Sequence, residues 1–265
     1  MDVAAQARIA RRDRAEIERI REAGRVVAAV LSELGTAAVP GVSTAELDRL
    51  ARARAEAMGA RPAFLGYRGY PASLCVSVND EVIHGIPSAR RLLREGDLVG
   101  LDFGAVLAGW YADAAVTVAV GRASAEAERL VAVTRRALAQ GIAAAWPGAR
   151  VGDVGAAVEA CAEGAGFSVV RDFVGHGVGR RLHEPPQVPN YGPPGTGPEL
   201  GEGMVLAIEP MVNAGTAQVR VLADGWTAVT ADGRSSAHFE HTVAVTAGGP
   251  EVLTAGAEGV SPVAG

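Results

Sequence analysis

The stretch that decides the fold is Glu95-Gly96-Asp97-Leu98-Val99-Gly100-Leu101-Asp102, because its pattern returns later in the chain as Glu202-Gly203-Met204-Val205-Leu206-Ala207-Ile208-Glu209. Each copy opens on Glu-Gly, continues as an apolar run typical of a buried strand, and ends in a carboxylate. Long-period self-similarity is the signature of repeated units, so the two copies indicate two equivalent halves. Chance similarity of apolar segments is the alternative, and the matched Glu-Gly openings argue against it.

The same offset, from Glu95 to Glu202, relates two expected pairs of helices. Pro40-Gly41 and Pro147-Gly148 each precede the second helix of a pair, and they are separated by this offset as well. The first pair is expected from Ala15 to Leu34 and, opened by a capping box at Ser43-Thr44-Ala45-Glu46, up to Gly59. The second pair is expected to begin near Ser124 and to end near Gly164 or Gly166.

These elements predict an α+β fold. Its core is a pseudo-twofold, largely antiparallel β-sheet, covered on one face by two pairs of helices. We expect an N-terminal extension over residues 1–14, a single domain over 15–254 and a flexible tail over 255–265. Within the domain, the two repeats are expected at about 15–120 and 122–245.

Composition narrows the class of protein. The chain has 265 residues, of which 49% are hydrophobic, and no run of about 18 apolar residues, so we expect neither a membrane span nor a membrane partner. A net charge of −5 without a long basic block gives nucleic-acid binding no electrostatic support. Two cysteines do not form a disulfide framework, and a cytoplasmic location is the expectation.

Two aspartates lie on the strands of an expected hairpin. Asp102 ends the first apolar run, Asp113 lies in the strand-like run that follows, and a short turn separates them. If the turn centres on Leu107-Ala108, the two aspartates are directly opposed, and if it centres on Ala108-Gly109 they are diagonal neighbours on one face. Carboxylates this close repel each other unless one is protonated or a cation lies between them. Turn-flanking aspartates that are simply exposed to solvent are the alternative.

The second half repeats this arrangement. Glu209 ends its strand, and Glu240 begins the later strand-like run up to Val245. A twofold relation between the halves brings all four carboxylates to one place, where they cannot all ionise without metal. His176, with a glycine on each side that lets another group approach the ring, adds an imidazole. Such a ligand set suits two ions of Mn²⁺, Fe²⁺, Co²⁺ or Zn²⁺.

The remaining histidines are assigned by their surroundings. His84 and His183 lie in segments stiffened by proline, and we expect them to contact substrate as donors or proton shuttles. His238 and His241 flank Glu240, and we expect both to point to the opposite face, without a catalytic role. A purely structural role is the alternative for a lone histidine such as His176.

Five segments of the chain resemble the signatures of one family, the type I methionine aminopeptidases. These are metallopeptidases of the M24 family with the pita-bread fold, and the resemblance runs from about Ile17 to Leu253. The segments are Ser77-Val78-Asn79-Asp80-Glu81-Val82-Ile83-His84-Gly85-Ile86-Pro87, Gly175-His176-Gly177-Val178-Gly179, Leu182-His183-Glu184-Pro185-Pro186-Gln187-Val188-Pro189-Asn190-Tyr191, Glu209-Pro210, and Ser236-Ala237-His238-Phe239-Glu240-His241-Thr242. Each motif alone is weakly specific, but five in order with compatible spacing are highly specific.

The resemblance implies roles for the site residues. Asp113 and Glu240 are expected to bridge two divalent ions, Asp102 to bind one ion, and His176 and Glu209 to bind the other. Glu209 is also the implied general base. His84 and His183 are expected to contact the substrate amide and to stabilise the tetrahedral intermediate.

The resemblance also implies a substrate and a pocket. The reaction is removal of the N-terminal methionine from nascent polypeptides whose second residue is small, by a monomer acting at or near the ribosome. The methionine pocket is expected to consist of His84 with Phe64, Tyr67, Tyr70, Cys75, Leu182 and Trp226. Some relatives carry Phe where this chain has Leu182 and Cys where it has Phe64, and both replacements remain apolar. Ordinary core packing is the alternative for Tyr67, Tyr70 and Trp226.

Two other functions remain open at the level of sequence. A peptidase of the same fold that cleaves Xaa-Pro bonds usually has a separate N-terminal domain, whereas the expected helices and a pocket strand take up the stretch before Ser77 here. A catalytically dead member that serves as a binding scaffold would be expected to lack one or more ligands, and all five are present. Cys75 is not expected to act as a nucleophile, because no histidine–carboxylate pair is left to activate it.

Overall fold

The structure, a computed structural model, describes residues 9–256 of the chain. Its helical elements are α1 (Arg14–Ala37), α2 (Thr44–Ala57), α3 (Ala125–Ala144), α4 (Val151–Glu163) and the short 3-10 helix η1 (Tyr67–Gly69). The expected capping box at Ser43 and Glu46 begins α2, and a second box at Asp13 and Glu16 begins α1. Helix α1 ends at Ala37, beyond Leu34, the end that periodicity predicted.

The strands form one large sheet and two small ones. They are β1 (Arg61–Pro62), β2 (Cys75–Val78), β3 (Glu81–Ile83), β4 (Leu98–Leu107), β5 (Trp110–Ala119), β6 (Ser168–Val169), β7 (Gly175–Gly177), β8 (Glu184–Val188), β9 (Val205–Ile208), β10 (Met211–Asn213), β11 (Val219–Val221), β12 (Ala228–Thr230), β13 (Ser236–His238), β14 (Glu240–Thr246) and β15 (Gly249–Val252). The large sheet has the order β1-β4-β5-β14-β9-β7-β8, with β2 added on β4 and β15 on β14. The small sheets have the orders β13-β10-β6 and β11-β12-β3.

The large sheet has the pseudo-twofold order that the repeat predicts. Strands β5 and β14 pair at its centre, β4 and β9 flank them, and β2 and β7 pair with the outer edges of β4 and β9. All pairings of this sheet in the described chain are antiparallel. The predicted fold class is therefore confirmed, whereas the domain bounds stay predictions, and residues 1–8 and 257–265 of the expected extension and tail lie outside the described range.

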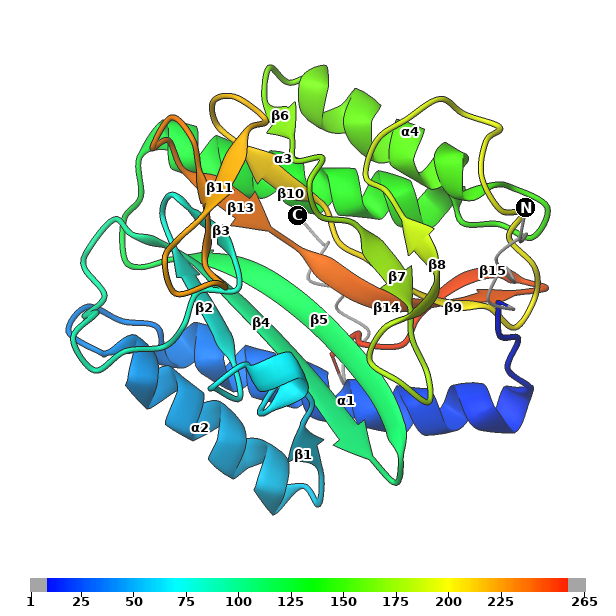
Figure 1. Cartoon of the computed structure of the whole chain (residues 1–265), viewed down its shortest axis with the longest axis horizontal. Helices are drawn as coiled ribbons and strands as arrows, with labels where there is room; N and C mark the ends of the chain where they lie inside the picture. The colour runs from blue at the N-terminus through cyan, green and yellow to red at the C-terminus, as the bar shows by residue number, and fades with distance from the viewer. Residues whose placement is uncertain (1–8, 257–265) are drawn as a thin grey trace.

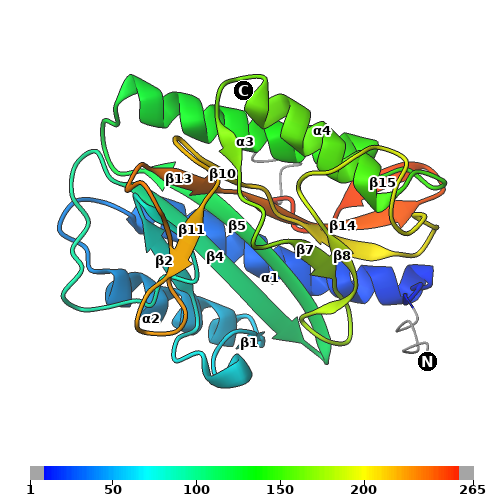
Figure 2. The same cartoon turned by 45° about the horizontal axis from the view of Figure 1, so that its top comes forward.

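The helices pack on the sheet in two pairs, one for each half (Figures 1 and 2). Alternate residues of β4, such as Leu101 and Phe103, are fully buried in one hydrophobic core with α1 and α2. Burial of a side chain the size of Phe103 stabilises the fold by about 1.5–3 kcal/mol. Because neighbouring residues of a strand point to opposite faces, Asp102 projects from the face turned away from α1. Helices α3 and α4 cover β9 and β14 through a second core in the same way.

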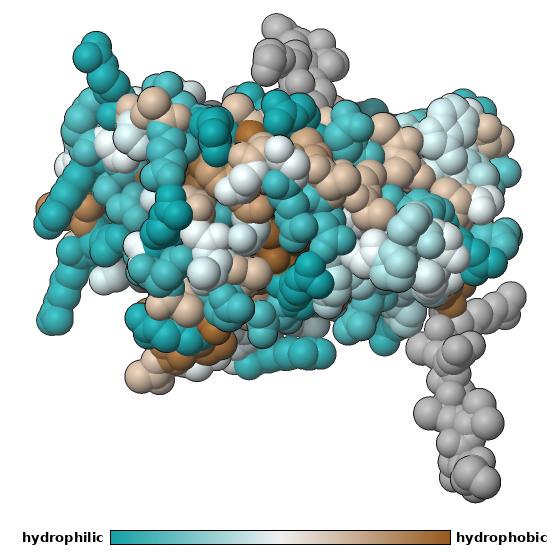
Figure 3. Space-filling view, turned by 90° about the horizontal axis from the view of Figure 1, so that it is seen from above, coloured by the Kyte–Doolittle hydropathy of each residue, from teal (hydrophilic) through white to brown (hydrophobic). Residues whose placement is uncertain are grey.

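The surface is mainly hydrophilic on the face shown in Figure 3, with apolar side chains interspersed among polar ones. Exposed large hydrophobic residues lie singly, mostly in connecting segments, as in most globular proteins. Within residues 9–256, no helix combines the length and the hydropathy that are needed to cross a membrane.

Candidate metal centre and active site

The hairpin of β4 and β5 places the first carboxylate pair. Leu107 pairs with Trp110, so the turn centres on Ala108-Gly109, and both turn residues have positive φ. Asp102 therefore pairs with Ala115, and Asp113 lies two residues away from that partner, diagonally across the hairpin. The structure thus selects the diagonal arrangement from the two that the sequence left open, with both side chains on the face turned away from α1.

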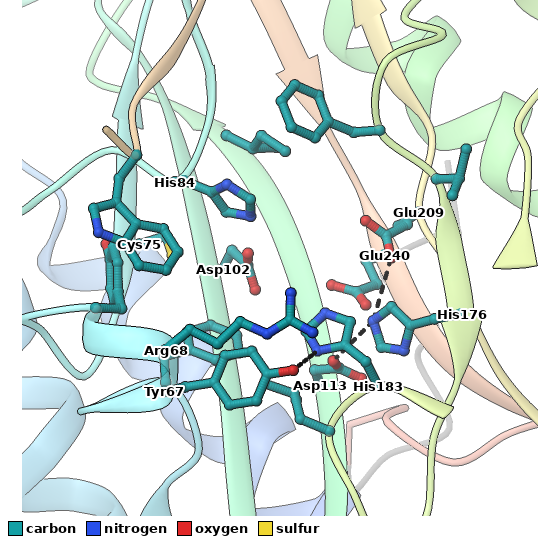
Figure 4. A pocket seen from close by; sticks show the side chains of 17 residues that line it. Tyr67, Arg68, Cys75, His84, Asp102, Asp113, His176, His183, Glu209 and Glu240 are labelled. Carbon is teal, nitrogen blue, oxygen red and sulfur yellow. Dashed lines mark hydrogen bonds and ion pairs between the residues drawn. The ribbon is translucent and has the colours of Figure 1, made fainter. Parts of the chain in front are cut away.

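The central strand pair brings the other two carboxylates to the same place. Glu240 on β14 pairs with Ala115, the residue that also pairs with Asp102 from the other side. On β14 the next residue, His241, pairs with Ile208, so Glu209 follows opposite Glu240. One row across the sheet consequently carries three acids, and Figure 4 shows them facing a common space with Asp113.

His176 joins the carboxylates from β7. Its Nε2 lies 3.6 Å from Asp113 Oδ2 and 3.5 Å from Glu209 Oε1 (Figure 4). Its Nδ1 lies 2.9 Å from the carbonyl oxygen of Gly177, which can only accept, so Nδ1 carries the proton and the Nε2 lone pair faces the acids. One ligand atom from each of Asp113, His176 and Glu240 lies within 4.8 Å of the other two.

The electrostatics of this cluster call for a cation. Burial, and then the neighbouring acids, raise the pKa values of Asp102, Glu209 and Glu240 well above their usual range. Burial also raises the pKa of Asp113 to about 6, and burial lowers that of His176 to about 4. Asp102 Oδ1 is buried without a hydrogen-bond partner among the described residues. Four clustered acids, of which Asp113 and Glu240 are buried, and one neutral imidazole fit hard or borderline divalent cations.

His84 and His183 line the same cavity beside the acid cluster (Figure 4). His183 Nδ1 lies 2.8 Å from the Tyr67 hydroxyl, and its ring centroid lies 4.1 Å from that of His176. His84 has a left-handed backbone conformation with φ of 60°, which is rare for a residue other than glycine and often marks a functional site. Burial lowers the pKa of His84 to about 4, so its ring is neutral at pH 7.

All residues that the sequence predicts for the site line one cavity of about 220 Å³. Its apolar wall includes Tyr70 and Trp226, whose rings meet edge to face at 5.1 Å, and Cys75, whose thiol pKa is raised by burial. The cavity also contains four residues that were not predicted, which are Arg68, Ile83, Phe173 and Val174. Val174 could have been found from sequence, because it lies two residues before His176 and so shares its face of the strand.

One expectation about the histidines is wrong. His241 does point away from the cluster and contacts Thr254, with Nδ1 and Oγ1 2.8 Å apart. His238, however, is buried with Nε2 4.0 Å from Glu209 Oε2, and this nitrogen has no hydrogen-bond partner among the described residues. Residues two apart in an extended segment share a face. Because His238 lies two residues before Glu240, strand alternation places it on the face of Glu240.

The glycines beside His176 also serve a different purpose from the one expected. A Cβ at Gly175 would collide with the carbonyl oxygen of Ala207 on β9, and one at Gly177 with the carbonyl oxygen of Pro185 on β8. The two glycines therefore let the backbones of the neighbouring strands close on β7, rather than opening space at the imidazole ring. Gly175 and Gly177 therefore fix the position of His176 by allowing tight strand packing.

Comparison with known proteins places this site in a family. The sequence model of metallopeptidase family M24 matches residues 18–247, and the chain belongs to this family. Among its relatives, the methionine aminopeptidase of Clostridium acetobutylicum is 51% identical over 239 residues, which are 90% of this chain and 96% of that protein. The crystal structure of methionine aminopeptidase from Thermotoga maritima, 48% identical, superposes with a TM-score of 0.92 over 93% of this chain and 99% of its own.

Peptidases that act on proline-containing substrates are more distant. The prolidase from Pyrococcus furiosus is 22% identical, with a TM-score of 0.74, and the match covers 92% of this chain but 65% of the prolidase. That likeness shows a shared fold. The predicted membership in the M24 family and the pita-bread fold are confirmed by the family match and by the structural neighbours.

Proposed function

We propose that this chain is a metal-dependent methionine aminopeptidase that removes the N-terminal methionine from nascent polypeptides whose second residue is small. The observation that carries the proposal is a cluster of four acids and one imidazole, of which Asp113, Glu240 and His176 are buried, in one small cavity that also has an apolar wall. At about 220 Å³, the cavity is smaller than the roughly 300–1,000 Å³ of typical ligand pockets. Such a space suits one side chain, and the high identity to methionine aminopeptidases supports methionine as that side chain.

We propose that five side chains act as ligands and hold two divalent ions of cobalt, manganese, iron or zinc. Asp113 and Glu240 would be shared by both ions, and this is supported by the ligand atom that each contributes to one compact group with His176. Asp102 would hold one ion, and His176 and Glu209 the other. When bound, such ions lower the pKa of a coordinated water and polarise the peptide carbonyl.

The side chains around the cluster would handle the protons and the substrate. Glu209 is proposed as the general base, because its carboxylate belongs to the acid cluster, with Oε1 3.5 Å from His176 Nε2, and a deprotonated carboxylate can accept a proton from water. Tyr67 can donate its hydroxyl proton to His183 Nδ1, which places the proton of the neutral ring on Nε2. His84 and His183 could then donate hydrogen bonds to the substrate amide and to the developing oxyanion.

The apolar wall would select methionine. Tyr70, Cys75 and Trp226 offer the polarisable and aromatic surface that a thioether favours. The Tyr70 hydroxyl lies 3.0 Å from the carbonyl oxygen of Gly85, and this contact holds the ring in place. We further propose that the substrates are the amino termini of nascent chains at the ribosome and that the enzyme acts as a monomer in the cytoplasm.

The proposal is tested with purified full-length chain, first stripped of metal and then supplied with Mn²⁺ or Co²⁺. A Met-Ala-Ser peptide should release free methionine, and Glu240→Ala should abolish that release because it removes a proposed bridging ligand. Release that persists in Glu240→Ala would contradict the dinuclear arrangement. Preference of the wild type for a peptide with proline second and any residue first would instead support an Xaa-Pro peptidase, and absence of both activities would support a binding scaffold.

A further inference from the structure

The segment that precedes α1 packs against the second half of the chain. The backbone N–H of Arg12 donates to the carbonyl oxygen of Gly203, in the turn that precedes β9, at 2.6 Å. The Arg12 guanidinium pairs with Glu184 at 2.5 Å between Nη2 and Oε2. Their side chains are only 12% and 7% exposed, so this ion pair is largely withdrawn from water. Loss of one partner from such a pair leaves an uncompensated charge and is costly.

Glu184 uses its other oxygen to close a turn of the active site. Its Oε1 accepts from the backbone N–H groups of Arg180, at 2.8 Å, and Arg181, at 3.0 Å. The segment 180–184 closed in this way carries Leu182 and His183, both of which line the cavity. Arg12 thus fixes the carboxylate of Glu184, and this carboxylate in turn fixes segment 180–184.

Neighbouring residues form a slot for the guanidinium of Arg12. A Cβ at Gly179 would lie 2.6 Å from Arg12 Nη2, so the glycine there leaves the room that this side chain occupies. The fully buried indole of Trp110 has its centroid 5.6 Å from Arg12 Cζ and 3.7 Å from Arg180 Cζ. The carbonyl oxygen of Gly179 in turn accepts from the N–H of Tyr111 at 2.8 Å. The start of β5 is therefore tied to the same turn.

We propose that Arg12 is a positioning residue for the aminopeptidase reaction. Through Glu184 it fixes the turn that places Leu182 in the pocket wall and His183 beside the metal centre. Arg12 is not among the described residues that line the cavity, so it acts only through the turn. This inference rests on the proposed function and extends it, because it assigns to the segment before α1 a role in positioning active-site residues.

The test compares three variants of the full-length chain. Arg12→Met keeps the apolar stem and removes the charge, and Arg12→Lys restores a charge without the planar fork. Arg11→Met is the matched control, because Arg11 lies in the same segment, is exposed, and forms no ion pair with a described carboxylate. Each protein is examined for amide hydrogen exchange without metal, for Mn²⁺ affinity, and for kcat and KM with a Met-Ala-Ser peptide.

Arg12→Met should accelerate exchange in segment 179–184 and lower kcat/KM by about 10-fold to 100-fold, the scale of loss when a reacting group is slightly misplaced. Its Mn²⁺ affinity should equal that of the wild type, because no metal ligand is moved. Arg12→Lys should recover part of both losses, and Arg11→Met should match the wild type. A loss confined to this turn distinguishes positioning from general destabilisation.

Two results would overturn the proposal. One is exchange in segment 179–184 of Arg12→Met equal to that of Arg11→Met, and the other is acceleration spread evenly over the whole sheet. If Arg12→Met does not fold, Arg12→Gln takes its place, because it also removes the charge, and wild-type exchange in segment 179–184 together with wild-type kcat/KM in Arg12→Gln would overturn the proposal as well. Failure of the proposed function is seen separately, as a wild type that releases no methionine, while the exchange measurement requires no turnover.

Discussion

His176 and Ser77 occupy equivalent positions in the two halves of the sheet. His176 on β7 pairs with Ala207, Ser77 on β2 pairs with Gly100, and these two partners are matched positions of the repeated strand. Ser77 uses its hydroxyl locally, where it accepts from the N–H of Gly85 at 3.2 Å. The pseudo-twofold therefore supplies acids from both halves but an imidazole from only one, so the two proposed metal positions are chemically different.

This asymmetry predicts that the two residues contribute very differently to metal binding. His176→Ala should weaken Mn²⁺ binding by more than about 100-fold at one of the two positions, since loss of a supporting residue alone costs about 10–100-fold. Ser77→Ala, the matched control at the equivalent position, should bind metal as the wild type does. Calorimetric titration of the metal-free chain measures both. Equal affinities in the two variants would remove His176 from the ligand set.

Metal affinity should rise with pH near neutrality. In the metal-free chain Asp113 has a pKa of about 6, and those of Asp102, Glu209 and Glu240 are raised further above their usual range. A cation binds the deprotonated acids, so it must displace these protons, and its apparent affinity falls as pH falls through about 6. His176, with a pKa of about 4, is already neutral there and releases none.

Titrations in two buffers of different ionisation enthalpy count the protons that are released. At pH 6 the wild type should release more than one proton as metal binds, and Glu240→Gln should release fewer, because the amide carries no titratable proton. Affinity that is constant between about pH 5.5 and 7.5 would contradict raised pKa values in the acid cluster.

His238 should support Glu209. Its buried Nε2 lies 4.0 Å from Glu209 Oε2, and Gln at this position keeps a side-chain donor whereas Leu does not. His238→Leu should lower kcat/KM by about 10–100-fold, and His238→Gln should retain most of it. His241→Gln is the control, because His241 points away from the cluster and contacts Thr254, and it should leave kcat/KM unchanged. A His238→Leu enzyme with wild-type kcat/KM would show that the contact has no role.

The sequence predicted the parts of the site that depend on regular strand geometry. The repeat that ends in Asp102 and Glu209 predicted that the two halves bring their carboxylates together, because strand register fixes both the position and the face of a side chain. The centre of the first hairpin turn could not be predicted from the sequence. Ala108 takes a positive φ that alanine rarely adopts, and no Asn-Gly or Asp-Gly marks the centre.

Long-range contacts of irregular segments were beyond the sequence. Arg68 in η1 lines the cavity through a kink with φ of 49°, and no periodic pattern predicts such a placement. Arg12 meets Glu184 from the other half of the chain, and only the folded structure brings the two together. The purpose of Gly175 and Gly177 was likewise hidden, since it depends on how closely the backbones of β8 and β9 approach.

The close packing at Gly175 predicts opposite outcomes for one substitution at two glycines. At Gly175 a methyl group would collide with the carbonyl oxygen of Ala207 and must push β7 away from β9. Gly175→Ala should therefore destabilise the chain by about 1–3 kcal/mol, as overpacking typically does. It should also weaken Mn²⁺ binding, because His176 moves with its strand.

Gly35 is the matched control, because it lies within α1 and a Cβ there would meet only the side chain of Val118, at an ordinary 3.7 Å. Gly35→Ala should stabilise the chain by about 0.5–1 kcal/mol, since alanine loses less backbone entropy in a helix. Urea unfolding of the metal-free proteins gives both free energies, and metal titration gives the affinities. If Gly175→Ala matched Gly35→Ala in stability and in Mn²⁺ affinity, tight packing of β7 against β9 could not be what positions His176.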